Sequence, residues 1–170
     1  MKSFLLLLVA TSATLLVSAQ ADKSKRPSPP ALVKETLANG TEISIDYSQP
    51  SVKGRKIGTD VEPKDGKVWR AGANEATVFE VSKDVKVEGQ ALPAGKYGLY
   101  MIKNGEEWTI IFNKTWKQWG TDYTEADDAL RVKVKVGKAK EFAEKLTYTI
   151  SKKGRVSLVW GDLQASFNVE

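Results

Sequence analysis

Apolar and polar residues alternate with a period of two along most of the chain beyond residue 30. Residues 42–47 read Glu-Ile-Ser-Ile-Asp-Tyr, and the same alternation recurs over 130–136 and 146–150. Successive side chains of a β-strand point to opposite faces, so this period indicates strands that bury one face and expose the other. The sequence therefore predicts an all-β fold.

The expected strands are short and are separated by turn-forming residues. Asn-Gly pairs at 39–40 and 104–105 favour tight hairpin turns between antiparallel strands, and Gly161 predicts a bend or bulge. The one helical candidate is 124–130, which begins with a threonine as N-cap and acidic residues in its first turn. About ten strands and at most one short helix predict a two-layer antiparallel sandwich or a flattened barrel. The expected strands cover residues 31–37, 43–47, 77–82, 85–88, 96–103, 108–113, 130–136, 146–150, 155–160 and 163–169.

The apolar positions of these strands define the expected core. They share one face of each strand, and that face must pack against a second layer to leave water. Arg131, Lys133 and Lys135 alternate with apolar residues and are expected on the solvated face of an edge strand. The residues expected to face inward are Ile43, Ile45, Phe79, Val81, Leu99, Trp108, Ile110, Phe112, Val132, Val134, Tyr148, Ile150, Leu158 and Phe167.

The first 19 residues have the three parts of a secretory signal. One lysine precedes a mostly apolar run over 4–17, and small residues around Ala19 offer a cleavage site. The run is shorter than the roughly 20 apolar residues that cross a bilayer, so no membrane span is expected. We expect a signal peptide over 1–19, a proline-rich leader over 20–30 and a single β domain over 31–170, in a secreted or periplasmic protein.

The chain contains no cysteine and no histidine among its 170 residues. This composition excludes a cysteine nucleophile, a Ser-His-Asp triad, a histidine general base and ordinary zinc, haem or iron–sulfur sites. The acidic residues over 122–128 lack the alternating ligands and central glycine of a calcium loop. The net charge of +5 comes from scattered lysines and arginines, which is not typical of a nucleic-acid-binding surface. We therefore expect no metal, no cofactor and no nucleic-acid partner.

Two stretches, 46–58 and 68–77, do not alternate and are rich in polar and aromatic residues. Arginine presents a planar fork that pairs with a carboxylate or phosphate, asparagine both donates and accepts hydrogen bonds, and an aromatic ring offers a flat face. The stretches contain a candidate site for a polar ligand, formed by Tyr47, Arg55, Trp69, Arg70, Asn74 and Glu75. A structural interpretation stays open, in which Arg70 pairs with Glu75 to pin the loop and Trp69 fills the core.

A second aromatic group lies in the loop after residue 113 and consists of Trp116, Trp119 and Tyr123. Aromatic side chains on a loop can stack on a sugar or on a partner protein, or they can cover the end of a sandwich. We expect the second role.

The sequences Tyr-Ser-x-Pro-Ser-Val-Lys-Gly-Arg over 47–55 and Trp-Arg-x-Gly-Ala-Asn-Glu over 69–75 are the most specific parts of a family resemblance. Together with 92–97 and 107–113, they resemble the secreted bacterial family called domain of unknown function 2911, from Arg26 to the end of the chain. Members of that family are typical of Bacteroidota, so the resemblance implies a periplasmic or secreted protein there. It implies no catalytic residues.

Three functions stay open on these observations. The leading one is a non-catalytic binding or structural module of the cell envelope that holds a polar or anionic small molecule, a glycan or an envelope protein. A hydrolase would need two carboxylates about 5–9.5 Å apart, and the sequence offers Glu75 with Asp46 or Asp162. A lipid carrier would instead have an apolar cavity between its sheets.

Overall fold

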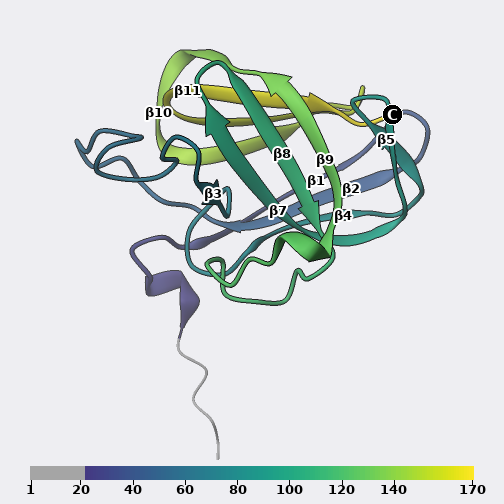
Figure 1. Ribbon diagram of the computed structural model, residues 1–170, viewed down its shortest axis with the longest axis horizontal. Coiled ribbons are helices and arrows are strands. Elements are labelled where there is room, and N and C mark those ends of the chain that lie inside the picture. The colour runs from purple at the N-terminus through teal and green to yellow at the C-terminus, as the bar shows by residue number, and fades with distance from the viewer. Residues whose placement is uncertain (1–21) are drawn as a thin grey trace, which may run out of the picture.

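The computed structural model describes residues 22–170, so the expected signal peptide over 1–19 lies outside the described residues. Eleven β-strands and two short 3-10 turns, η1 (Lys23–Lys25) and η2 (Glu125–Asp127), make up its regular structure, and no α-helix occurs in 22–170 (Figure 1). The predicted all-β fold is confirmed.

The larger of two layers is an open antiparallel sheet of seven strands. Strand β3 (Val68–Trp69) pairs with β7 beside the main path, and the two edges of the sheet are β1 and β9. Because these edges do not pair, the sheet is not a closed barrel. The main path runs in the order β1 (Pro30–Thr36), β2 (Glu42–Ser48), β4 (Thr77–Val81), β7 (Gly95–Asn104), β8 (Glu107–Asn113) and β9 (Asp128–Lys135).

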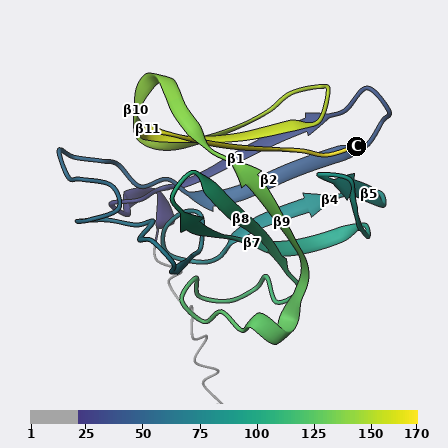
Figure 2. The ribbon, with the colours of Figure 1, turned by 45° about the horizontal axis from the view of Figure 1, so that its top comes forward.

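The second layer is a long hairpin of β10 (Gly137–Ile150) and β11 (Arg155–Asn168) that lies across the inner face of the large sheet (Figure 2). Strand β10 lies beside β1, and β11 lies beside β9. A small hairpin of β5 (Val85–Val87) and β6 (Gln90–Leu92) pairs with the last residues of the chain. Of the two predicted architectures, the two-layer sandwich is the one observed.

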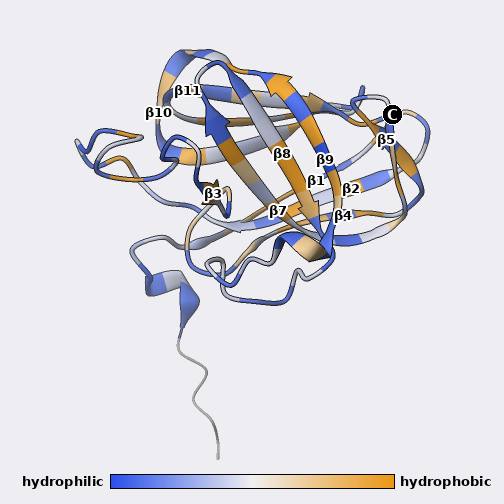
Figure 3. Cartoon of the chain, viewed as in Figure 1, coloured by the Kyte–Doolittle hydropathy of each residue, from blue (hydrophilic) through white to orange (hydrophobic). Residues whose placement is uncertain are grey.

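The core lies between the large sheet and the β10–β11 hairpin. The ring centroid of Phe167 lies 6.2 Å from that of Phe79 and 5.7 Å from that of Phe112, which joins the two layers. Thirteen of the fourteen residues expected to face inward are buried, and Ile150 is partly buried. Figure 3 shows the alternation of hydrophobic and hydrophilic residues along β9.

Several boundaries differ from the predicted ones. The helix expected over 124–130 is only the 3-10 turn η2, because Thr124 makes no side-chain cap and the chain enters β9 at residue 128. The two strands expected over 155–160 and 163–169 are one strand, β11, whose pairing with β10 shifts register on both sides of Gly161. The shift confirms the predicted irregularity at Gly161, where φ is 58°.

The 114–124 loop covers the outer face of the large sheet and does not cap an end of the sandwich as expected. The rings of Tyr123 and Tyr100 lie 4.9 Å apart on that face, and the hydroxyl of Tyr123 donates to Asp128 at 2.7 Å. Arg131, expected to be solvated, donates to this same carboxylate at 2.7 Å. Lys133 is exposed as predicted.

Candidate functional site

The 70–76 loop between β3 and β4 is held in one conformation by its surroundings. The hydroxyl of Tyr148 donates to the carbonyl of Ala71 at 2.8 Å, and the amide of Asn74 donates to the carbonyl of Ser28 at 3.0 Å. Ala71 and Asn74 both adopt left-handed backbone conformations, with φ of 51° and 61°. Residues other than glycine are held there only when their surroundings fix them, so the loop is a preorganised element.

Three of the six predicted site residues, Arg55, Trp69 and Arg70, line one pocket of about 300 Å³. It lies where the 70–76 loop and the 49–67 loop meet β11. We call it the arginine pocket, and its other lining residues are Ser28, Pro50, Asp60, Val61, Glu62, Lys64, Gly72, Ala73 and Trp160.

Two N–H donors among the residues that line the arginine pocket have no hydrogen-bond partner. They are Nε of Arg70 and Nε1 of Trp160, and both atoms are buried. Nearly all buried polar groups in proteins are paired, and leaving one unpaired costs about 1–3 kcal/mol. No other side-chain nitrogen or oxygen in residues 22–170 is left in this state. Both unsatisfied donors therefore belong to residues that line the arginine pocket, and Arg70 also lines a separate pocket with Gly120 and Tyr123.

The position of Arg70 depends on a neighbouring glycine. A Cβ atom at Gly120 would lie 1.9 Å from Cδ of Arg70, so only glycine lets the arginine stem lie against this backbone. Trp69 is buried, stacks on Trp160 with ring centroids 5.9 Å apart, and donates to the carbonyl of Gly72 at 3.0 Å. Trp69 thus fills the core, as the structural interpretation predicted.

Arg55 is exposed at the rim of the arginine pocket. Its Nε donates to the carbonyl of Val52 at 3.0 Å, and Nη2 donates to the carbonyl of Ser51 at 2.7 Å. These two bonds fix the direction of the guanidinium and leave the majority of its five N–H groups for solvent or a ligand.

The predicted pair between Arg70 and Glu75 is wrong, because Glu75 binds the leader. Its carboxylate lies 3.0 Å from Nζ of Lys23 and accepts two hydrogen bonds from Nη1 of Arg26, at 3.0 and 2.8 Å. Partial burial would raise the pKa of Glu75, but hydrogen bonds from its own backbone N–H and from these two cations outweigh it and lower the pKa to about 2.

The ring of Tyr47 packs in the core, and the residue also lines the second pocket described below. Its ring lies 4.8 Å from that of Tyr148, and its hydroxyl accepts a hydrogen bond from the backbone N–H of Tyr148 at 3.3 Å. Burial raises the pKa of Tyr47.

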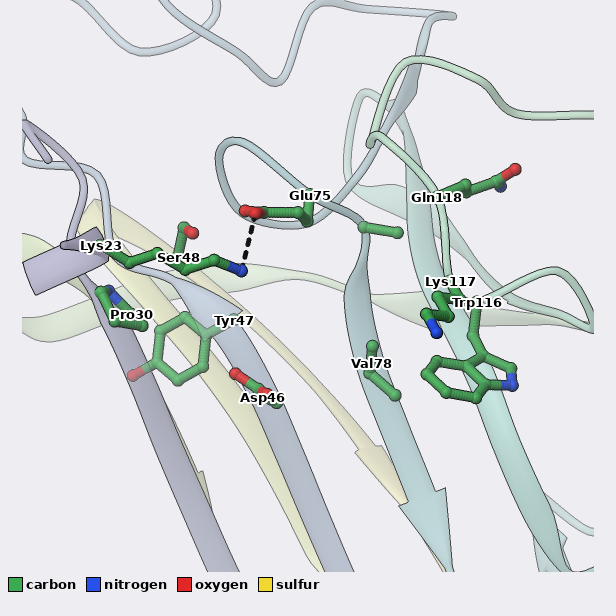
Figure 4. Close-up of a pocket in the computed structure, with 11 residues that line it drawn as sticks. Lys23, Pro30, Asp46, Tyr47, Ser48, Glu75, Val78, Trp116, Lys117 and Gln118 are labelled. Carbon is green, nitrogen blue, oxygen red and sulfur yellow. Dashed lines mark ion pairs between the residues drawn. The ribbon is translucent and has the colours of Figure 1, made fainter. Parts of the chain in front are cut away.

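Glu75 lines a second pocket, of about 270 Å³, on the outer face of the large sheet (Figure 4). Asp46 lies in this pocket as well, whereas Asp162 lines a different one. Of the two carboxylate pairs that a hydrolase could use, only Asp46 and Glu75 share a pocket. We call it the outer-face pocket, and its lining residues are Lys23, Pro30, Asp46, Tyr47, Ser48, Glu75, Ala76, Val78, Trp116, Lys117 and Gln118.

Residues 22–170 contain no group of three or more acidic side chains placed to hold a metal ion. No helix in this part of the chain has the length and apolar character that crossing a membrane requires.

Sequence reasoning missed Trp160 as a site residue. It lies in an alternating strand, where a large apolar ring indicates a core position, and it is indeed only 2% exposed. The one signal in its residue type is the indole N–H, because a buried tryptophan usually finds a partner for it. Whether Trp160 has such a partner depends on tertiary structure.

A family model described as a protein of unknown function (DUF2911) matches residues 28–169. The chain belongs to this family, as the resemblance predicted. The match includes every lining residue of the arginine pocket, while Lys23 and Arg26 precede it. Neither the comparison with curated proteins nor the comparison with solved structures finds a match.

Proposed function

We propose that this member of the DUF2911 family is a non-catalytic binding module of the cell envelope, exported by a signal over 1–19, whose arginine pocket holds a small anionic ligand. The observation that carries the proposal is the pair of buried, unpaired donors, Nε of Arg70 and Nε1 of Trp160, on two residues that line one pocket. A carboxylate, sulfate or phosphate offers several acceptor atoms, and hydrogen bonds to a charged acceptor are the stronger kind.

The charges around the arginine pocket favour an anion. Three cations, Arg55, Lys64 and Arg70, line it together with two carboxylates, Asp60 and Glu62. Both carboxylates hold their own loop, since Asp60 accepts from the backbone N–H of Lys56 at 2.8 Å and Glu62 accepts from that of Lys64 at 2.9 Å. A volume of about 300 Å³ suits a ligand the size of a monosaccharide acid or a small organic phosphate.

Two rival functions have less support. The space between the layers is filled by aromatic rings such as Phe79, Phe112 and Phe167, where a lipid carrier would have a cavity. Glu75, the carboxylate that both hydrolase pairs share, is held by two cations with a pKa of about 2. Such a carboxylate is a weak base and a weak nucleophile.

Isothermal titration calorimetry with glucuronate, galacturonate, citrate and inorganic phosphate tests the proposal. We expect at least one of these anions to bind in the arginine pocket. Arg70→Gln and Trp160→Phe should each weaken anion binding by about tenfold or more, because each removes one charge-assisted hydrogen bond.

The matched control is Lys133→Ala, which removes an exposed cation paired only with Glu107 at the surface. It should leave anion binding unchanged. A thermal melt without ligand checks that Trp160→Phe is folded, because the smaller ring removes an unpaired buried donor but leaves a cavity beside Trp69. Failure of every anion to bind, or full affinity in both pocket variants, would contradict the proposal.

A further inference from the structure

The outer-face pocket differs from the arginine pocket in its charge. Two lysines, Lys23 and Lys117, line it together with two carboxylates, Asp46 and Glu75, so the formal charges balance. Because Coulomb attraction then favours neither sign, the pocket has no net preference for an ion. Its selectivity must come from hydrogen bonds and apolar contacts.

Asp46 is the free acceptor of this pocket. It lies on the outer face of β2, in register with Leu32 of β1 and Val78 of β4. Its carboxylate forms no hydrogen bond and no ion pair with residues 22–170, in contrast to Glu75. Partial desolvation raises the pKa of Asp46, although nearby Lys23 opposes the shift. Because Asp46 is exposed and has no donor of its own, its carboxylate is free to accept hydrogen bonds from ligand hydroxyls.

An apolar wall stands opposite the leader. Figure 4 shows Val78 and Trp116 on one side of the pocket and Lys23 and Pro30 on the other. The 114–124 loop approaches β7 closely enough that a Cβ atom at Gly98 would lie 3.6 Å from Cα of Trp116. The backbone at Trp116 therefore packs on the sheet, and Nζ of Lys96 lies 5.3 Å from the centroid of the indole ring.

We propose that the outer-face pocket binds a neutral sugar ring. A pyranose has an apolar C–H face, which fits the indole of Trp116 and the side chain of Val78, and a rim of hydroxyl donors, which fits the carboxylate of Asp46. The charges of the lining side chains balance, so they give no reason for a preference for an anionic sugar. This site is separate from the arginine pocket, so it does not depend on the function proposed above.

Saturation-transfer-difference NMR with glucose, galactose, mannose and N-acetylglucosamine tests this site. We expect transfer to the C–H protons of at least one of these sugars. Asp46→Ala and Trp116→Ala should each weaken binding of that sugar by about tenfold, because each removes one of the two recognition elements. Both residues lie on the outer face, so a thermal melt checks that each variant is folded.

Two controls separate this site from its surroundings and from the arginine pocket. Ser44→Ala changes the same face of β2 two residues away, outside the pocket, and should leave sugar binding unchanged. Trp160→Phe should also leave sugar binding unchanged, while it weakens the binding of any anion. No transfer to any of the four sugars would overturn the inference. Full sugar binding in both Asp46→Ala and Trp116→Ala would also overturn it. The same holds if glucuronate displaces the sugar and the Trp160→Phe variant no longer binds the sugar.

Discussion

Glu75 joins the leader to the β domain. Lys23 and Arg26 both reach its carboxylate, while Asn74 next to it holds the carbonyl of Ser28. Three residues of the leader region therefore make a defined contact with the 70–76 loop through two adjacent side chains. The contact also sets one wall of the outer-face pocket, because Lys23 lines it.

This contact predicts a specific sensitivity to acid. The pKa of Glu75 is lowered to about 2 from 4.5, so the pair stabilises the fold above about pH 4.5 and loses that effect as the pH falls toward 2. The side chain is 38% exposed, and solvent screening limits the effect to about 1 kcal/mol. Urea unfolding at pH 7 and pH 3 should show that the free energy of unfolding falls less on acidification in Glu75→Gln than in the unmodified protein.

Glu106→Gln is the matched control, since Glu106 is exposed and forms no ion pair within 22–170. In this variant the free energy of unfolding should fall between pH 7 and pH 3 by as much as in the unmodified protein. Identical pH dependence in the Glu75→Gln variant would show that the leader contact does not stabilise the fold.

Residue types indicated which side chains were chemically capable of binding, but not which of them meet. Arg70 and Glu75 are close in sequence and have opposite charge, which suggested a pair. The left-handed Ala71 and Asn74 between them redirect the chain, and Arg70 lies against Gly120 while Glu75 faces the leader. Such redirection is set by tertiary hydrogen bonds and has no local sequence signal.

At the scale of elements, the alternation located the strands that bury one face. It missed β3 and β6, which have two and three residues and are too short to show a period. It also missed the first half of β10, over 137–145, where polar residues occupy both faces. Most residues of this half are exposed, which explains why the sequence shows no alternation there.

The alternation also predicts unequal effects of two substitutions in adjacent strands. Ile110 of β8 is fully buried, so Ile110→Ala should lower the free energy of unfolding by about 2–5 kcal/mol, as large-to-small changes in cores do. Lys133 of β9, in register with Thr109 of β8, is exposed, and Lys133→Ala should change stability by no more than about 0.5 kcal/mol. Urea denaturation of both variants measures the difference, and small losses of equal size would show that the inward face is misassigned.

At the scale of the whole molecule, a rigid sandwich carries two chemically different pockets. The core of aromatic and aliphatic side chains fixes the strands, and the 49–67, 70–76 and 114–124 loops supply the polar lining. This division of roles between the core and the loops suits a binding module, because loops on a rigid scaffold can carry recognition groups without disturbing the core. Sequence alone treated the six site residues as one set. The fold divides them: Arg55, Trp69 and Arg70 line one pocket, Tyr47 and Glu75 line the other, and Asn74 binds the leader.

If the arginine pocket binds an acceptor through its buried donors, the indole N–H of Trp160 reports the binding directly. The chain has five tryptophans, so its NMR spectrum has five indole N–H signals, and Trp160→Phe identifies the one of interest. Trp108 is an internal reference, because its N–H already donates to the carbonyl of Gly105 at 3.2 Å. On titration with glucuronate, galacturonate, citrate or phosphate, we expect the Trp160 signal to move downfield and to saturate for at least one anion, while the Trp108 signal stays in place. A Trp160 signal that no anion moves, or that glucose moves equally, would contradict the claim.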